Sequence, residues 1–367
     1  MRCIGLMSGT SLDGIDGVLA VLDPGLRVEA HVHRPMPAAL RAELLALNTP
    51  GADELHRGAL AANALAMAQA EVVAELLQRS GLSATDVQAV GSHGQTVRHR
   101  PGAFDGCGYT WQLNQPALLA ERCGIAVVAD FRSRDVAAGG QGAPLVPAFH
   151  AQVFGRPDRA RAVLNLGGIG NLTLLPAGGG AVAGFDCGPG NALLDLWVQR
   201  HRGQDFDADG QWAAGGQVHA PLLQRLMAEP FLAAAPPKST GRDLFHADWL
   251  AQRLQGTASV PPQDVQATLA EFTARAAAEA LQRHAPASRE LLVCGGGALN
   301  ADLMRRLAHL LPGLSVRSTA DEGLPPMQVE ATAFAWLAAA HLQGRPANLP
   351  AVTGARGPRV LGALYPA

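Results

Sequence analysis

The sequence predicts an α/β protein of two domains, each of which opens with a glycine-containing β-hairpin. The chain has 367 residues, which exceeds the size at which a single hydrophobic core keeps growing, so two domains are expected. Short apolar runs typical of strands alternate with amphipathic helical stretches, as in an α/β fold. A hairpin pattern stands near the start of the chain and again near its middle, as in a duplicated domain.

The first hairpin is predicted from the apolar run 3–7, the polar segment 8–17 and the apolar run 18–22. Two short apolar runs joined by a Gly- and Asp-rich segment are typical of a strand–turn–strand unit. Because its residues are small, backbone N–H groups of the turn can close on an anion, so we interpret it as a phosphate-binding segment. A plain Asp-Gly hairpin turn is the alternative.

Two further glycine clusters follow strand-like runs. Residues 161–166 lead into the glycines of 167–170 and a resumed apolar run, which predicts a second hairpin. The cluster 295–297 follows the apolar run 291–294 and precedes a helical pattern over 300–311. A glycine turn between strand and helix lets the backbone lie flat against a planar or phosphorylated ligand. Three such turns in one chain indicate phosphate or nucleotide binding.

The remaining elements fit two α/β domains. Helices are expected over 60–77, 115–122, 192–200, 264–284 and 328–342, and strands over 28–34, 87–92 and 125–129. The Gly-rich stretch 139–142 breaks the pattern. We therefore assign residues 1–145 to the first domain and residues 146–345 to the second.

Composition and charge exclude several classes of protein. The formal net charge is −2 and the basic residues are scattered, so neither nucleic acid nor an anionic membrane is an expected partner. No run approaches the roughly 20 apolar residues of a membrane span, and the N-terminus lacks a signal-peptide pattern. The five cysteines are isolated, which argues against zinc and indicates a reducing compartment. We expect a cytoplasmic protein.

Two nucleotide-binding motifs are also excluded. Lys238 is the only lysine and no glycine loop of Walker spacing precedes it, so a P-loop is absent. No Gly-x-Gly-x-x-Gly follows a strand with an acidic residue about 20 positions later, which disfavours a Rossmann dehydrogenase.

Six motifs together resemble the anhydro-N-acetylmuramic acid kinase family, within the superfamily of sugar kinases, actin and heat-shock chaperone ATPases. They are residues 5–16, 92–96, 130–132, 139–145, 185–191 and 237–242, and 328–331 and 352–356 continue the match. The resemblance covers nearly the whole chain. It implies two duplicated ribonuclease-H-like (actin-like ATPase) domains around a central cleft, with the tail 346–367 packed back on the first domain, and a homodimer.

The resemblance implies a kinase that uses ATP and Mg²⁺ on 1,6-anhydro-N-acetylmuramic acid in peptidoglycan recycling. Asp186 would activate a water that attacks the anomeric carbon, while the departing 6-oxygen takes the γ-phosphoryl group; the products are N-acetylmuramic acid 6-phosphate and ADP. For Asp186 the alternative is an Asx-turn aspartate. For the whole protein the alternatives are an ordinary hydroxyl sugar kinase and a non-enzymatic ATP-dependent binding module.

The resemblance also assigns nucleotide contacts to the three glycine turns. They fall on Gly9, Thr10, Ser11, Leu12, Asp13, Gly14, Ile15, Asp16, Gly167, Gly168, Gly170, Asn171, Gly295, Gly296, Gly297 and Asn300. The superfamily's hairpin aspartates are replaced here by Met7 and Asn165. Asp13, Asp16 and Asp186 are then the carboxylates available for Mg²⁺, and the choice among them stays open.

Sugar contacts are assigned to His93, Gln95 and Arg132 of the first domain and to Glu330 of the second. The guanidinium of Arg132 suits the lactyl carboxylate of the substrate. The alternatives are a surface ion pair of Arg132 with Asp130 or Asp135, and a satisfied loop histidine at position 93. Lys238 and Arg242 lie in a matching motif without an assigned role.

Overall fold

The computed structural model describes residues 1–9, 11–241, 244–257 and 259–367, and it divides into two compact units. Unit 1 comprises Met1–Phe149 and Gln328–Ala367, and unit 2 comprises His150–Met327. The predicted boundary at 145/146 therefore lies four residues too early, and the predicted assignment of residues 328–345 to the second domain differs from the structure. Thr10 of the first turn and Arg242 lie outside the described residues.

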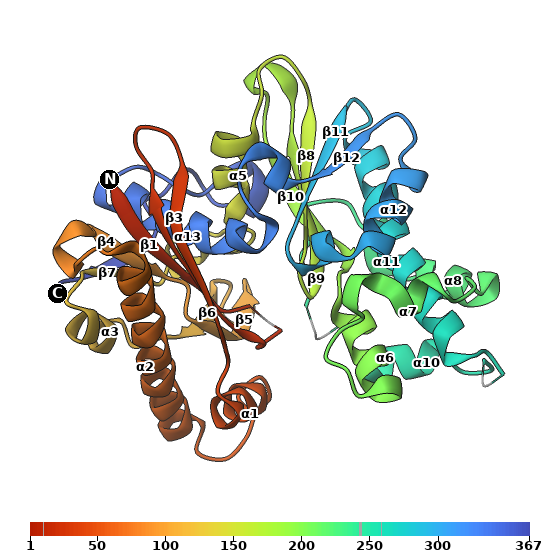
Figure 1. Cartoon of the computed structure of the whole chain (residues 1–367), viewed down its shortest axis with the longest axis horizontal. Coiled ribbons are helices and arrows are strands. Elements are labelled where there is room, and N and C mark those ends of the chain that lie inside the picture. The colour runs from red at the N-terminus through yellow and green to blue at the C-terminus, as the bar shows by residue number, and fades with distance from the viewer. Residues whose placement is uncertain (10, 242–243, 258) are drawn as a thin grey trace. The chain divides into compact units, whose positions relative to one another are not determined.

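Unit 1 is built on a six-stranded sheet in the order β13-β7-β4-β1-β2-β3 (Figure 1). The first three strands form an antiparallel meander, β4 and β7 run parallel to β1, and β13 pairs antiparallel with β7. The pairing of β13 places the C-terminal tail in unit 1. The strands of this unit, including the separate hairpin β5–β6, are β1 (Arg2–Met7), β2 (Gly14–Val21), β3 (Arg27–Pro35), β4 (Ala89–Ser92), β5 (Gln95–Pro101), β6 (Gly108–Leu113), β7 (Val127–Ala129) and β13 (Ala363–Tyr365).

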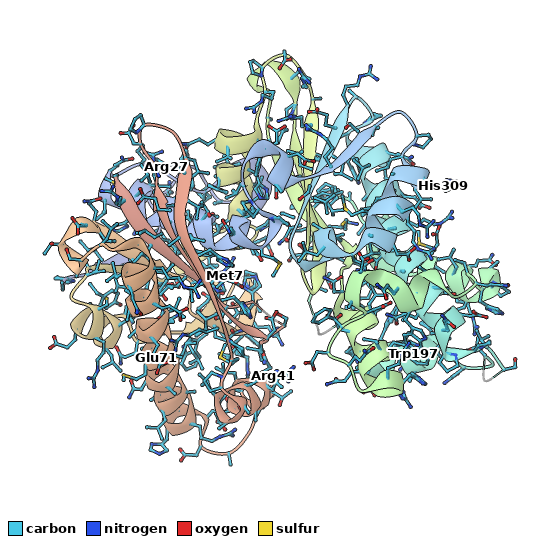
Figure 2. All side chains as sticks on the ribbon, in the orientation of Figure 1. Met7, Arg27, Arg41, Glu71, Trp197 and His309 are labelled. Carbon is cyan, nitrogen blue, oxygen red and sulfur yellow. The ribbon has the colours of Figure 1, made fainter. Side chains whose placement is uncertain are left out.

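The helices of unit 1 are α1 (Ala38–Ala46), α2 (Glu54–Ser80), α3 (Pro116–Cys123), α4 (Ser133–Ala137), α13 (Val329–Leu342) and α14 (Pro350–Thr353), and α5 (Val146–Phe154) spans the boundary in the sequence between the two units. The long α2 buries a stripe that includes Leu65 and Val72 in the core, whereas Glu71 is exposed on the helix (Figure 2). Among the described residues α2 is the one helix whose length and mean hydropathy would permit a membrane span. Nearly half of its most apolar window is buried inside the fold.

The Ala-rich α13 lies directly on the sheet because two glycines leave room for its backbone. Gly5 of β1 and Gly91 of β4 are partners in register. A Cβ on Gly5 would lie 1.8 Å from the carbonyl oxygen of Ala331, and one on Gly91 would lie 2.1 Å from that of Phe334. The close approach explains why α13 belongs to unit 1.

Unit 2 repeats the strand plan of unit 1. Its sheet has the order β10-β9-β8-β11-β12, in which β8, β9 and β10 form an antiparallel meander and β11 and β12 run parallel to β8. If the strands of each sheet are numbered along the chain, both sheets contain the spatial order 3-2-1-4-5, which in unit 1 corresponds to β3, β2, β1, β4 and β7. The repetition confirms the predicted pair of ribonuclease-H-like domains. The strands are β8 (Arg161–Leu166), β9 (Ile169–Leu175), β10 (Ala183–Pro189), β11 (Glu290–Cys294) and β12 (Ser315–Ser318).

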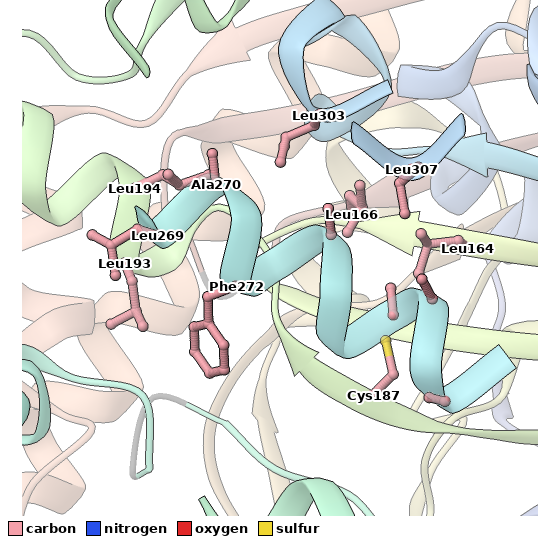
Figure 3. Close-up of a cluster of buried hydrophobic side chains, with 14 of the residues drawn as sticks. Leu164, Leu166, Cys187, Leu193, Leu194, Leu269, Ala270, Phe272, Leu303 and Leu307 are labelled. Atoms are coloured by element: carbon pink, nitrogen blue, oxygen red, sulfur yellow. The ribbon is translucent and has the colours of Figure 1, made fainter. Parts of the chain in front are cut away.

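The core of unit 2 forms around the long helix α11. Figure 3 shows Phe272, Leu269 and Ala270 of this helix in the buried cluster that also contains Leu164 and Leu166 of β8. Full burial of one such large side chain stabilises a fold by about 1.5–3 kcal/mol. The helices are α6 (Ala192–Arg202), α7 (Gln211–Ala214), α8 (Ala220–Met227), α9 (Pro230–Ala233), α10 (Ala247–Arg253), α11 (Pro262–His284) and α12 (Ala301–Leu310).

A buried ion network stands at the start of β8. The side chain of Arg161 is 3% exposed and donates to the carboxylates of Glu290 and Glu322. Arg317 donates to the same two carboxylates, at 3.1 and 2.9 Å. Each buried charge is thereby paired, which a buried ion requires.

Candidate active site

The first glycine turn connects β1 to β2 directly after Met7, which Figure 2 labels. Leu12 adopts a left-handed backbone conformation, with φ of 56°, and its side chain is buried. The backbone N–H of Leu12 donates to the carbonyl of Gly9 at 3.3 Å. Asp13 is exposed, and its Oδ1 accepts from the Ser11 hydroxyl at 2.5 Å and from the Gly14 N–H at 3.1 Å. The turn therefore holds one exposed carboxylate.

Asp16, also assigned to the nucleotide, is engaged elsewhere. Its Oδ1 lies 3.3 Å from Nε2 of His31 and 3.0 Å from Nδ1 of His33, both on β3. Burial opposes the ionisation of Asp16, but the hydrogen bonds from the two histidines outweigh it and lower the pKa of Asp16. The same hydrogen bond raises the pKa of His33. Asp13 is thus the better placed of the two aspartates for a ligand at the turn.

The segment that follows β4 is tied to the end of β1 by one hydrogen bond and to this turn by two. The N–H of His93 donates to the Leu6 carbonyl at 3.0 Å, the Ser8 hydroxyl donates to the Gly94 carbonyl at 3.0 Å, and Nε2 of Gln95 donates to the Gly9 carbonyl at 3.2 Å. Because β1, β4 and β7 are parallel, their carboxyl ends share one edge of the sheet. The structure therefore brings His93 and Gln95 to the first glycine turn.

Arg132, which follows β7, reaches the same edge. Its Nη2 and Nε lie 3.0 and 3.3 Å from Nε2 of His93, and its Nη1 donates to the Gly142 carbonyl at 2.8 Å. Burial of His93, together with the Arg132 charge, lowers the pKa of His93 to about 3. His93 is therefore neutral, and because Nε2 accepts from Arg132, its proton resides on Nδ1.

Nδ1 of His93 and Oε1 of Gln95, two residues apart in the sequence, are buried at this edge and have no hydrogen-bond partner among the described residues. Buried polar atoms are nearly always paired, so an orphaned donor and acceptor mark a place that water or a ligand completes. This observation fits the predicted role of the two residues in sugar binding.

Glu330 lies in unit 1, in the first turn of α13, and is half-buried. The expectation that it comes from the second domain is wrong, because α13 packs on the sheet of unit 1. The four residues predicted to bind sugar are therefore all in unit 1.

The second and third glycine turns meet in unit 2 around Leu166, the last residue of β8. The Leu166 carbonyl accepts from Nδ2 of Asn191 at 2.9 Å. A Cβ on Gly295 would lie 2.8 Å from that same carbonyl oxygen, and one on Gly297 would lie 2.4 Å from the Leu166 Cβ. Gly295 also has φ of 75°, so both close packing and backbone conformation require glycine there.

Hydrogen bonds also hold the second turn against the segment after β10. The carbonyls of Gly167 and Gly168 accept from the N–H groups of Asn191 and Gly190, at 2.8 and 3.0 Å. Gly170 and Asn171 open β9 opposite Gly188 and Asp186. After the third turn, the side chain of Asn300 caps α12 by accepting from the Leu303 N–H at 3.0 Å. The predicted nucleotide residues of the second turn are thus neighbours of the Asp186 strand, whereas Gly295 and Gly297 pack on Leu166 of β8.

Asp186 lies on β10, next to a bulge at which the strand register shifts between Asp186 and Gly188. Its carboxylate is half-buried, and Oδ2 accepts from the Thr240 N–H at 2.8 Å. Its own N–H donates to the Lys238 carbonyl at 3.1 Å. The segment 238–240 therefore fixes both the backbone and the carboxylate of Asp186.

Lys238, which sequence analysis left without a role, anchors this segment. Its ammonium donates to the carbonyls of Phe231 and Leu232, at 3.0 and 3.1 Å, and lies 4.7 Å from the centre of the Phe231 ring. The sequence feature that could have indicated such a role is that Lys238 is the only lysine of the chain. The structure assigns it to positioning the loop on Asp186.

Sequence analysis also missed a buried polar network behind the sugar residues. Asn114 Nδ2 donates to the Ser92 hydroxyl at 3.0 Å, and that hydroxyl lies 3.3 Å from Oε1 of Gln69 on α2. Asn114 follows a strand, as the predicted site residues do, which is the signal that could have found it. No group of three or more His, Cys, Asp or Glu side chains within 1–9, 11–241, 244–257 and 259–367 is arranged to hold a metal ion.

Comparison with known proteins relates these features to a family. The family model described as "Anhydro-N-acetylmuramic acid kinase" matches residues 1–367. A protein of that name from Variovorax paradoxus (strain S110) is 61% identical over 369 residues, covering 99% of this chain and 98% of the relative. Another from Bordetella petrii (strain ATCC BAA-461 / DSM 12804 / CCUG 43448) is 64% identical over 370 residues, covering 99% and 96%.

Among solved structures, component A of the (R)-2-hydroxyglutaryl-CoA dehydratase of Acidaminococcus fermentans is similar in fold. It aligns with a TM-score of 0.50 and 12% sequence identity, covering 91% of this chain and 96% of that one. At this level of identity the likeness concerns the fold alone.

Proposed function

The chain belongs to the anhydro-N-acetylmuramic acid kinase family, and we propose that it converts 1,6-anhydro-N-acetylmuramic acid and ATP to N-acetylmuramic acid 6-phosphate and ADP. The observation that carries this proposal is the match of the family over all 367 residues. The 6-oxygen of this sugar is locked in an internal ether, so hydrolysis of the ring must accompany phosphorylation. The product is a sugar of peptidoglycan recycling.

Asp186 is the proposed general base. A general base must be held in a fixed orientation toward the proton that it removes, and the N–H of Thr240 fixes one oxygen of this carboxylate. Asp186 takes a proton from water as the water oxygen bonds to the anomeric carbon. The bond from that carbon to the 6-oxygen breaks, and the 6-oxygen bonds to the γ-phosphorus as ADP leaves. This chemistry is inverting glycoside hydrolysis in which phosphorus replaces the proton of a general acid.

The sugar is proposed to bind through His93, Gln95, Arg132 and Glu330 of unit 1. The planar guanidinium of Arg132 matches a carboxylate, and the substrate carries one on its lactyl group. The orphaned Nδ1–H of His93 and Oε1 of Gln95 offer a donor and an acceptor for polar groups of the sugar.

ATP is proposed to bind through the backbone of the three glycine turns. Mg²⁺ neutralises charge on the transferring phosphoryl group when it is bound. Asp13 would hold it, because its carboxylate is exposed at the turn, whereas one oxygen of Asp16, Oδ1, is shared by His31 and His33. One protein carboxylate suffices for a Mg²⁺ ion that is also held by nucleotide phosphates.

The proposal includes a cytoplasmic homodimer. The reducing compartment is suggested by five cysteines that form no disulfide within the described part of the chain, and dimerisation by the family resemblance. Sedimentation of the purified protein at several concentrations tests the dimer.

The test of the reaction is mass spectrometry of the sugar product after incubation with anhydro-N-acetylmuramic acid and MgATP in ¹⁸O-enriched water. The expected product carries one phosphoryl group and, at early times, one heavy oxygen at the anomeric carbon. Phosphorylation without the heavy oxygen contradicts the coupled reaction. If folded, ATP-binding protein gives no phosphorylated sugar, the assignment fails and ordinary hydroxyl sugars become the candidates.

A further inference from the structure

Asp135, in the short helix α4, is a buried carboxylate with an unusual set of donors. The residue is 0% exposed. Its Oδ2 accepts from the Gly142 N–H at 2.8 Å, and its Oδ1 accepts from Nδ2 of Asn348 at 2.7 Å and from the Thr353 hydroxyl at 2.8 Å. These donors come from two segments more than 200 residues apart in the sequence. Asp135 therefore joins the loop before Gly142 to the C-terminal segment.

The loop is shaped around this carboxylate. A Cβ on Gly140 would lie 2.2 Å from Oδ2 of Asp135, and Gly142 has φ of 66°. The C-terminal segment reinforces the loop, because the Gln141 N–H donates to the Thr353 carbonyl at 2.7 Å. The Gly-rich stretch that sequence analysis treated as a domain break is thus an ordered loop closed on a buried charge.

Gly142 connects this buried charge to the proposed sugar site. Its N–H donates to Asp135, while its carbonyl accepts from Nη1 of Arg132 at 2.8 Å. The guanidinium of Arg132 in turn donates to Nε2 of His93. Displacement of Gly142 would therefore remove a fixed acceptor of Arg132 and disturb the orientation of the guanidinium.

We infer that Asp135 is a positioning residue for sugar binding: through both polar groups of Gly142 it orients the Arg132 guanidinium toward the substrate carboxylate, with Asn348 and Thr353 holding Asp135. The inference rests on the proposed function, in which Arg132 binds the lactyl group. A guanidinium whose orientation is preset loses less conformational freedom on binding than a free one. Loss of this preset orientation weakens substrate binding without touching the base, Asp186.

The test uses the full chain and the isosteric variant Thr353→Val, which removes one donor to Asp135. We expect KM for anhydro-N-acetylmuramic acid to rise about tenfold, the effect of one lost hydrogen bond to a charged group, with kcat and the KM for ATP within about twofold. An interaction used equally in the ground and transition states behaves in this way. Asp135→Asn, which puts an amide donor against other donors, should raise the same KM further if that variant folds.

Thr173→Val is the matched control. Thr173 is also 0% exposed, and its hydroxyl is hydrogen-bonded at 2.9 Å to Nδ1 of His150 in unit 2. It should lose thermal stability comparable to Thr353→Val and leave the sugar KM unchanged. If Thr353→Val lowers only the melting temperature and the fraction of active enzyme, as the control does, Asp135 is structural and the inference is overturned.

A double-mutant cycle decides whether the effect passes through Arg132. In an Arg132→Lys background, Thr353→Val should change the sugar KM by less than about twofold, because the oriented group is already gone. Independent, multiplicative effects would overturn the inference. Wild-type protein that fails to turn over the sugar refutes the proposed function, whereas active wild type with an unchanged KM in Thr353→Val refutes the inference alone.

Discussion

Gly5 and Gly91 stand side by side in register on β1 and β4, and the backbone of α13 lies where their side chains would be. The carbonyls of Ala331 and Phe334 fall 1.8 and 2.1 Å from the Cβ positions of the two glycines. Strands β1 and β4 are therefore in direct backbone contact with α13, a helix that begins more than 230 residues after β4. The same helix packs Phe334 against His93, with the two ring centroids 4.8 Å apart.

Gly91→Ala should destabilise unit 1 severely. The new methyl group would overlap the Phe334 carbonyl, and neither backbone can move without shifting the helix or the sheet. We expect a loss of more than about 4 kcal/mol in the free energy of unfolding, or failure to fold. Gly58→Ala in α2 is the control, because its Cβ would meet nothing nearer than Leu113 Cδ2 at 3.7 Å. Denaturant titration should show that Gly58→Ala is more stable than wild type by about 0.5–1 kcal/mol.

Arg161→Met should destabilise unit 2 through its ion network. Removing Arg161 takes away the one cation of the network that is itself buried; Glu290 and Glu322 keep only the partly exposed Arg317, Arg156 and Arg159 as partners. Breaking a buried pair in this way costs about 3–5 kcal/mol. Arg27→Met is the control, since the Arg27 side chain is 68% exposed in its pair with Glu29 and a surface pair contributes about 0–1 kcal/mol. Equal unfolding midpoints for the two variants would contradict this account.

The sequence predicted the strand–turn–strand units well because their signals are local. The runs before the turns at 8–13 and 167–168 are apolar and short, and the turns between them are rich in small residues. The position of α13 could not be predicted in the same way. Its alanines are distributed around the whole helix, so the sequence pattern does not indicate which face is buried. Its packing is determined by Gly5 and Gly91, and no sequence pattern links these glycines to residue 331.

In the candidate site, too, some features follow from local sequence patterns and others depend on contacts between distant residues. His93, Gln95 and Arg132 were named as sugar contacts through the motif resemblance. His93 and Arg132 follow β4 and β7, and parallel strands bring their carboxyl ends together, so their common location at one sheet edge could be expected from the sequence. Lys238 acts on Asp186 through a loop, and Asp135 acts on Arg132 through the backbone of Gly142. Such indirect effects depend on hydrogen bonds to backbone groups, and those leave no residue pattern in a single sequence.

Asp186→Asn should abolish turnover with little change in stability. The amide keeps the shape of the side chain and an acceptor for the Thr240 N–H, but it cannot take a proton from water. Loss of a general base costs about 10²–10⁴ in kcat. ADP release coupled to sugar phosphorylation gives the rate, and binding of the sugar measured by calorimetry should remain within about threefold of wild type. A variant that retained most of its kcat would remove Asp186 from the role of base.

Two buried histidines should contribute to the loss of stability between pH 6 and pH 4. Burial, together with Arg132 in the case of His93, lowers the pKa of His93 to about 3, and burial lowers that of His150 to about 3. The unfolded chain protonates each histidine below about pH 6.5, whereas the folded protein does so only near pH 3. Between these values the unfolded state binds more protons, so stability falls as the pH falls, by about 1.4 kcal/mol per pH unit for each histidine.

The His33–Asp16 pair contributes to the same curve with different signs. The raised pKa of His33 gives stability that is present below pH 6.5 and lost as the pH rises through its folded value, whereas the lowered pKa of Asp16 gives stability that is lost as the pH falls through its own. The raised pKa of His33 does not offset the effect on stability of the strongly lowered pKa values of His93 and His150. His150→Asn should therefore flatten the dependence of unfolding free energy on pH between 4 and 6 by about 1.4 kcal/mol per unit. An equal slope in wild type and His150→Asn would show that His150 is protonated in the folded protein, against its burial.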